Sequence, residues 1–355
     1  MRYSTAGDSV PENAQPLVMR YIKGTLAIAH NGNLTNAHEI RRELEHRGAI
    51  FQTTIDSEVI AYIIARERMH SGSIGKLGKG YVFASESCAL DACGAEFIRD
   101  VEPGEIVVVD PRGVKSIRDH CSGKISPCIF EYIYFARTDS VIDGVSVYEA
   151  RKEAGRLLAR QHPVEADLVI GVPESGIDAA IGYSEESGIP YEKGIVKNNY
   201  IGRTFIKPTQ QERRNSVRIK LNPLITAVEG KRIVMLDDSI VRGTTCDRIV
   251  KMLRDAGAKE VHLRISSPPF TWPCYYGTDI PSKNELIACK MSVEEIGRLS
   301  GADSIGFLEL DSLCQMIGKE EKCFCDACFT GNYPAPIPTR VMEGKPEQRC
   351  TPVHR

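Results

Sequence analysis

Two adjacent carboxylates, Asp237 and Asp238, end an apolar run and are followed by small and hydroxyl-bearing residues. Gly243 lets the backbone approach a ligand closely, while the hydroxyls of Thr244 and Thr245 and the unpaired N–H groups of a helix start can hold a phosphate. Carboxylates at a strand end can bind sugar hydroxyls directly or through Mg²⁺. These residues predict a sugar-phosphate site at a strand-to-helix junction. The plainer alternative is a capped helix after a buried strand.

Two further segments carry residues suited to the same chemistry. The loop 171–176 contains Ser175 and also follows an apolar run, although by itself it is typical of a plain turn. The basic, polar segment 197–220 contains Lys197 and Arg203. It indicates either a solvated surface or a mobile lid whose cations meet a diphosphate and whose closure keeps water from the reactive carbon.

Five of the twelve cysteines have a spacing that suits metal ligation. Cys325 and Cys328 form a CxxC pair, Cys323 precedes them, and Cys128 and Cys274 lie in separate segments. A lone CxxC suits a redox pair or half of a zinc site, whereas four thiolates from separate segments can hold a 4Fe–4S cluster. Free thiols without a metal are the plainer alternative. Cys323 could replace Cys325, but its spacing to Cys328 fits less well. The start of the chain does not resemble a secretion signal, so a disulfide framework is not expected.

The elements that position these residues follow from the apolar pattern. From about residue 128, buried-strand runs alternate with amphipathic helices, which indicates a parallel sheet with helices on its faces. Ligands bind at the carboxyl ends of the strands of such sheets. The predicted strands are 167–172, 232–237 and 260–266, and the predicted helices are 147–162 and 244–256.

The first 125 residues have a different texture. Short strand-like runs and two helices indicate an α+β unit with mostly antiparallel strands. The predicted strands are 25–30, 80–85 and 105–110, and the predicted helices are 36–46 and 56–69. We therefore expect an α/β and α+β protein with domains at 1–125 and 126–340 and a loose tail at 341–355.

Composition narrows the functional classes. The chain has 355 residues with 42% hydrophobic and 26% charged residues, typical of a globular protein of roughly two domains. A net charge of −2 gives no general attraction to nucleic acid or to an anionic membrane. No apolar run reaches the ~18 residues that span a bilayer. We expect a cytoplasmic enzyme without nucleic-acid or membrane partners.

The run Val234–Thr245 resembles the phosphoribosyl-diphosphate (PRPP) motif of type I phosphoribosyltransferases. In that family the two acids contact the ribose, and the following loop holds the 5-phosphate. The loop 171–176 corresponds to one that faces the pyrophosphate, with Ser175 at a Mg²⁺-associated position. The resemblance implies Mg²⁺ at Ser175, Asp237 and Asp238. It implies PRPP contacts from Asp237, Asp238, Ser239, Arg242, Gly243, Thr244, Thr245, Lys197 and Arg203.

The first half resembles a second family. The segments Met1–Gly7, His30–Asn36 and Thr54–Glu58 are similar to the glutamine pocket of class II glutamine amidotransferases. Together with Ala84–Leu90 and Tyr134–Ser140, they make nearly the whole chain resemble the glutamine PRPP amidotransferases. The domains at 1–125 and 126–340 would then be a truncated, N-terminal-nucleophile-type glutaminase domain and a type I phosphoribosyltransferase domain.

The resemblance assigns roles to four residues of the glutamine pocket. Arg2 would bind the glutamine carboxylate, and Asp56 would hold its amino group. Asn31 and Gly32 would form the oxyanion hole, with donors aimed at the developing negative oxygen. Without the resemblance, residues 30–33 read as a turn and Asp56 as a helix cap.

The chain departs from the family in two places. The family's nucleophile is an N-terminal cysteine whose free amine serves as its base. This chain begins at the arginine motif, and none of its cysteines can fill that role. Gly75 also joins directly to Lys76 where the family carries a further glutaminase segment. We therefore expect no glutamine hydrolysis from this chain and only the ammonia-dependent half-reaction.

The implied reaction is displacement of diphosphate from PRPP by ammonia drawn from glutamine, giving 5-phosphoribosylamine, the first committed step of purine synthesis. Two rival functions are a non-catalytic PRPP-binding regulator, which would need a basic DNA-binding segment, and a salvage base phosphoribosyltransferase, which would not need the glutamine-pocket motifs. Purine nucleotides are possible feedback ligands, and a homo-oligomer is expected. Four cysteines match the iron–sulfur subgroup, in which a 4Fe–4S cluster ties the two domains together: Cys128, Cys274, Cys325 and Cys328.

Overall fold

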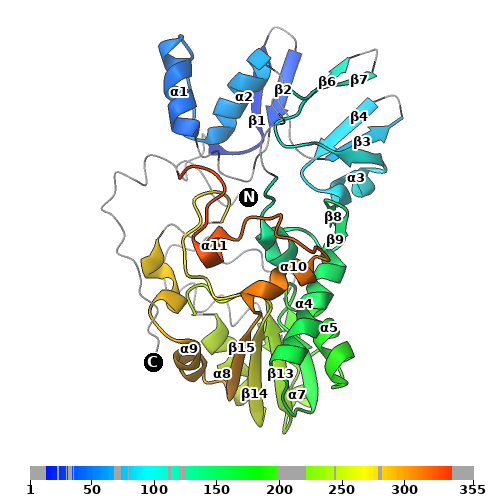
Figure 1. Ribbon diagram of the computed structural model, residues 1–355, viewed down its shortest axis with the longest axis vertical. Helices are drawn as coiled ribbons and strands as arrows, with labels where there is room; N and C mark the ends of the chain where they lie inside the picture. The colour runs from blue at the N-terminus through cyan, green and yellow to red at the C-terminus, as the bar shows by residue number, and fades with distance from the viewer. Residues whose placement is uncertain are drawn as a thin grey trace. The chain divides into compact units, whose positions relative to one another are not determined.

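The computed structural model (Figure 1) resolves the chain into two compact units. One comprises the described residues of 1–125, 274–278 and 335–337, and the other comprises 126–273 and 282–334. Each unit is treated by itself. The structure describes residues 13–21, 24–28, 30, 34, 36–67, 73–78, 80–110, 113–119, 121, 125–198, 221–243, 245–278 and 282–337.

The first unit is an α+β arrangement, as predicted. All of its strand pairings are antiparallel within the described residues. Short helices separate the strand pairs along the chain. The strands are β1 (Leu17–Tyr21) and β2 (Gly24–Ile28), then β3 (Ser73–Leu77), β4 (Gly80–Ala84) and β5 (Glu96–Asp100), then β6 (Ile106–Asp110) and β7 (Gly113–Ile117). The helices are α1 (Ala37–His46), α2 (Asp56–Glu67) and α3 (Ser87–Cys93).

The second unit is built on a four-stranded parallel sheet of order β10-β13-β14-β15. The three predicted strands are confirmed to within a residue at each end, and the fourth strand was not predicted. Two antiparallel hairpins accompany the sheet. The bounds are β8 (Val141–Ile142), β9 (Val145–Ser146), β10 (Leu168–Gly171), β11 (Ile195–Lys197), β12 (Leu221–Pro223), β13 (Arg232–Asp237), β14 (Glu260–Ile265) and β15 (Ser304–Phe307).

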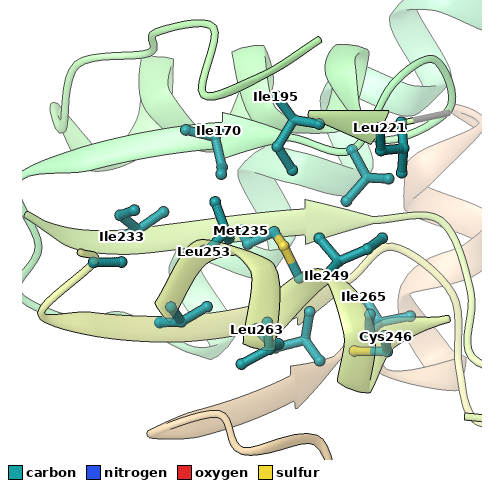
Figure 2. Packing of buried hydrophobic residues seen from close by; sticks show 14 of the residues in the cluster. Ile170, Ile195, Leu221, Ile233, Met235, Cys246, Ile249, Leu253, Leu263 and Ile265 are labelled. Atoms are coloured by element: carbon teal, nitrogen blue, oxygen red, sulfur yellow. The ribbon is translucent and has the colours of Figure 1, made fainter. Parts of the chain in front are cut away.

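Helices cover the sheet on both faces, which explains why its inner strands read as nearly continuous apolar runs. Strand residues of one face, among them Ile170, Met235 and Leu263, interlock with Ile249 and Leu253 of the helix after β13 (Figure 2). The helix after β10 packs against β10 and β13. The longer helices are α4 (Val147–Gln161), α5 (Ile177–Ser187), α8 (Cys246–Asp255) and α9 (Val293–Ser300).

Short helical turns connect these elements. Helix α8 begins at Cys246, two residues later than predicted, because Thr245 takes the capping position before it. In the described ranges no helix is long and apolar enough to cross a membrane. The short turns are η2 (Glu131–Phe135), α7 (Ile225–Val228), η4 (Lys283–Glu285), η5 (Ile287–Cys289), η6 (Leu310–Ser312), α10 (Leu313–Met316) and α11 (Ala327–Thr330).

Helices α4 and α5 approach each other closely because each presents a glycine to the other's backbone. A Cβ built on Gly155 would lie 1.9 Å from the carbonyl oxygen of Ala179, and one built on Gly182 would lie 1.9 Å from that of Lys152. Neither carbonyl can move without shifting its helix. Since α5 also carries the loop that follows β10, this contact sets the position of one side of the sheet's carboxyl edge.

We expect the substitution Gly155→Ala to destabilise the second unit by about 2–3 kcal/mol, because the added methyl group meets backbone rather than a flexible side chain. Urea denaturation followed by circular dichroism measures the change in the free energy of unfolding. Gly297→Ala in α9 is the matched control, since its nearest neighbour is the Ile305 side chain. A loss at Gly155 no larger than at Gly297 would contradict the close-contact account.

Candidate active site

The site lies at the carboxyl edge of the parallel sheet, where β10 and β13 are neighbours. Gly171 pairs with Leu236 at the ends of these strands, so the loops that follow them leave from the same edge. One loop runs from Val172 to Gly176, and the other runs from Asp238 to Thr245. The parallel pairing therefore brings together two loops that lie more than sixty residues apart in the sequence.

Glycines allow the first loop to fold back onto the end of β13. A Cβ on Gly176 would lie 2.3 Å from the carbonyl oxygen of Leu236, and one on Gly171 would lie 2.6 Å from that of Gly176. The N–H of Val172 donates to the Leu236 oxygen at 2.8 Å. Any side chain at these glycines would push the loop away from the strand. The close approach places Ser175 beside the second loop.

Asp237 and Asp238 are buried at this edge, with only 8% and 7% of their surfaces exposed. The Ser175 hydroxyl donates to Oδ1 of Asp238 at 2.5 Å, and the Ser239 hydroxyl donates to Oδ2. The N–H of Asp238 donates to Oδ1 of Asp237 at 3.0 Å. Two adjacent buried carboxylates thus accept hydrogen bonds from two hydroxyl groups and one backbone N–H at the end of an otherwise apolar strand.

Burial raises the pKa of both carboxyls, and the neighbouring charge of Asp238 raises the pKa of Asp237 further. Hydrogen bonds from Ser175 and Ser239 oppose the rise in the pKa of Asp238. Two carboxylates this close cannot both ionise cheaply in a site with little water. A divalent cation or several hydroxyl donors would stabilise the doubly ionised form, so the pair is suited to binding such a ligand.

The second loop is shaped by contacts from a distant segment. Gly243 has a φ of +78°, and a Cβ there would lie 2.5 Å from Cδ1 of Ile287. Arg242, a predicted PRPP contact, forms an ion pair with Glu285. Thr245 is exposed, and its side chain makes no capping hydrogen bond. Capping of α8 therefore does not compete with a ligand for the Thr245 hydroxyl. Thr244 lies outside the described residues.

A pocket of about 290 Å³ lies beside the first loop. Lys197, a predicted PRPP contact, lines it at the end of β11, and its Nζ lies 3.4 Å from a carboxylate oxygen of the exposed Glu174. Lys193 and Tyr191 line the same pocket, together with Gly171. Because Glu174 also lines the pocket, the two lysines leave its side chains with one net positive charge. Arg203 lies outside the described residues.

In the first unit, Asp56 opens α2 and is buried with 4% exposure. Its Oδ2 accepts a hydrogen bond from the N–H of Leu34 at 2.8 Å, and its Oδ1 lies 3.5 Å from Nδ1 of His30. Burial alone would raise the pKa of Asp56, but His30 and the Leu34 N–H together lower it. Oδ1 has no hydrogen-bond partner among the described residues. The other predicted pocket residues, Arg2, Asn31 and Gly32, lie outside the described residues.

The backbone brings two of the predicted cluster cysteines side by side. Cys128 and Cys325 form a parallel bridge, in which the N–H of Cys325 donates to the carbonyl oxygen of Pro127 at 2.7 Å. The carbonyl oxygen of Cys328 accepts hydrogen bonds from the N–H groups of Thr271 and Trp272, both at 3.1 Å. Cys274 follows two residues further along the chain. Across the described ranges, no group of three or more His, Cys, Asp or Glu side chains is arranged to hold a metal.

Sequence reasoning missed the residues that approach the loops from elsewhere in the chain. Glu285 and Ile287 contact the second loop from more than forty residues away. Lys193 and Tyr191 enter the pocket beside the first loop. None of these residues belongs to a motif with a spacing of its own, so no pattern along the chain could have identified them.

The comparisons with known proteins agree with this geometry. Residues 1–77 match the model of the glutamine amidotransferase domain family. The amidophosphoribosyltransferase of Archaeoglobus fulgidus is 47% identical over 384 aligned positions, covering 97% of this chain and 84% of the relative. That of Bacillus subtilis is 48% identical, covering 95% and 80%.

A solved structure of the glutamine PRPP amidotransferase from B. subtilis, complexed with ADP and GMP, superposes with a TM-score of 0.82 at 47% identity. It covers 93% of this chain and 82% of the solved one. A second solved structure, described as the allosteric regulatory enzyme of purine biosynthesis, has a TM-score of 0.81 at 48% identity, with coverage of 92% and 79%. The similarity thus extends through both units. The chain belongs to the amidophosphoribosyltransferase family.

Proposed function

We propose that this chain forms 5-phosphoribosylamine from PRPP, with ammonia displacing diphosphate at C1 of the ribose. The observation that carries the proposal is the buried pair Asp237 and Asp238 at the carboxyl edge, with two phosphate-suited loops beside it. Family membership supports the same reaction, because relatives that share nearly half of the sequence are named amidophosphoribosyltransferases. The reaction begins the purine pathway, and we place it in the cytoplasm.

The two ends of the site suit the two ends of the transition state. As the bond to diphosphate breaks, positive charge develops on the ribose ring and negative charge grows on the leaving group. Asp237 and Asp238 would stabilise the positive charge on the ribose ring and bind the ribose hydroxyls. Lys197 and Arg203 would stabilise the negative charge on the leaving diphosphate. The loop from Ser239 through Arg242, Gly243 and Thr244 to Thr245 would bind the 5-phosphate.

The carboxyl edge also fits a bound Mg²⁺. Two buried carboxylates and the Ser175 hydroxyl present hard oxygen ligands, the kind that Mg²⁺ prefers. Burial raises the pKa of both carboxyls, and a bound cation would favour their ionised forms. When bound, Mg²⁺ would supply charge neutralisation for the diphosphate. Ser175, Asp237 and Asp238 would hold and orient it.

In the first unit we propose a pocket for glutamine. The buried Oδ1 of Asp56, which has no hydrogen-bond partner in the described chain, suits the substrate's amino group. Nδ1 of His30 lies 3.5 Å from this oxygen, beyond an ordinary hydrogen bond, so an ammonium group that donates to Oδ1 would add a shorter contact. Arg2 would bind the glutamine carboxylate, and Asn31 and Gly32 would form the oxyanion hole. The ammonia-dependent half of the reaction uses residues of the second unit alone.

We also propose that a segment present in the relatives is missing near Gly75 and Lys76. The alignment with the A. fulgidus relative runs over 384 positions, more than the 355 residues of this chain. Both residues lie within β3, which pairs with β4 without interruption and with β5 through a register shift next to Gly75. The residues on either side of the proposed deletion therefore form one strand, β3, of a three-stranded sheet.

A 4Fe–4S cluster on Cys128, Cys274, Cys325 and Cys328 is the third proposal. The bridge between Cys128 and Cys325 and the CxxC spacing to Cys328 support it. The described side chains do not by themselves form a three-ligand metal group, so the thiolates would have to turn toward a common centre. The role we assign to the cluster is structural, and no step of the reaction passes through it.

Purine nucleotides are the proposed feedback ligands, because a relative of known structure was solved with ADP and GMP. We also propose that the chain assembles as a homo-oligomer.

The substitution Asp238→Asn tests the proposed function. It should lower kcat/KM for PRPP in the ammonia-dependent assay on the order of 100-fold, because a charge that meets the transition state is lost. It should leave the melting temperature unchanged or raised, because a buried charge is also removed. Asp247→Asn, in the first turn of α8, is the control and should retain activity. Retained activity in Asp238→Asn, or no phosphoribosylamine from the unaltered chain with ammonium, would contradict the proposal. Replacing ammonium by glutamine tests the glutaminase unit separately.

The cluster proposal predicts about four iron and four sulfide ions per chain after anaerobic purification. Cys325→Ser should abolish them, whereas Cys93→Ser, on the exposed end of α3, should not. If Cys323→Ser abolished the cluster and Cys325→Ser did not, the cluster ligand would be Cys323 in place of Cys325. Bound zinc, or no metal in the unaltered protein, would overturn the proposal.

A further inference from the structure

The short helical turns η4 and η5 lie against the phosphate loop. Nε of Arg242 donates to Oε2 of Glu285 at 2.8 Å, and a second guanidinium nitrogen donates to the same oxygen. The N–H of Ile287 donates to the carbonyl oxygen of Val241 at 2.9 Å. The Ile287 side chain occupies the space that a Cβ on Gly243 would need. Three consecutive residues of the loop are thus in contact with one distant segment.

This segment is anchored on its other side by the only tryptophan of the chain. Nζ of Lys283 lies 3.2 Å from the centre of the Trp272 ring, and Lys283 is 6% exposed. A desolvated cation over an indole ring is a strong contact for its size. Gly331 packs so closely on the same ring that a Cβ there would lie 2.5 Å from it. Turn η4 is therefore held in place at Lys283, two residues before Glu285.

The ion pair between Arg242 and Glu285 is the solvent-exposed part of this contact. The two side chains are 50% and 36% exposed, so the pair is partly screened by water and its contribution is small. It nevertheless fixes the residue directly before Gly243, where the backbone has to present its N–H groups.

We propose that Glu285 is a positioning residue, which orders the phosphate loop through Arg242 and thereby sets the affinity for PRPP. This inference rests on the proposed function. The loop would grip the 5-phosphate equally in the ground state and in the transition state, because that phosphate does not react. Loosening the loop therefore raises KM for PRPP and leaves kcat unchanged.

The test compares Glu285→Gln, Arg242→Gln and the double variant in the ammonia-dependent assay. Glu285→Gln should raise KM for PRPP roughly two- to five-fold, in line with a partly exposed ion pair, at unchanged kcat. The double variant should have the same KM as Arg242→Gln, because Glu285 acts only through Arg242. Glu102→Gln, which breaks the exposed ion pair of Glu102 with Arg118 in the first unit, is the matched control and should leave KM unchanged.

Three results would overturn the inference while the unaltered chain stays active. A lower KM in Glu285→Gln would mean that Glu285 competes with the phosphate for Arg242. Additive effects in the double variant would mean that the two residues act independently. An unchanged KM would mean that Ile287 alone orders the loop. Inactivity of the unaltered chain would instead overturn the proposed function, and the inference with it.

Discussion

The arrangement of the site depends on two adjacent carboxylates that are buried at the end of a parallel strand. Burial raises the pKa of both groups, so the folded protein holds protons there more tightly than the unfolded chain does. Since the unfolded groups ionise near the ordinary aspartate pKa, the pair costs stability as the pH rises above that value. A globular protein keeps such a cost only where a ligand or a function offsets it. A cation or a polyhydroxy ligand bound to the pair would offset this cost.

The fold around the pair brings donors close to it. Gly171 and Gly176 let one loop fold against the end of β13, which places the Ser175 hydroxyl on Asp238. The glycine contact between α4 and α5 holds α5, the helix into which that loop leads. On the other side, Ile287 and Glu285 shape the second loop. Small residues thus determine how closely the two loops approach, and ordinary core packing keeps them in place.

Sequence predicted the elements that carry the site well where they are contiguous along the chain. Strand β13, its terminal carboxylates and helix α8 are contiguous, so one run of residues contains the whole strand–loop–helix unit. Strand β15 was missed because Ser304–Phe307 is short, contains a glycine and is only half buried, so it has no apolar run to recognise. The contact of Glu285 with Arg242 was missed because it joins segments 43 residues apart and depends on the anchoring of η4. For Asp56 the resemblance supplied a role. Only the structure shows that its Oδ1 has no hydrogen-bond partner among the described residues.

Titration calorimetry of the unaltered chain with PRPP in the presence of Mg²⁺ tests the central claim most directly. The account predicts saturable binding at one site per chain, and much weaker binding by the Asp238→Asn variant. Folded protein that takes up no PRPP, or an Asp238→Asn variant that binds PRPP as tightly as the unaltered chain, would contradict the claim that this buried pair forms the ligand site.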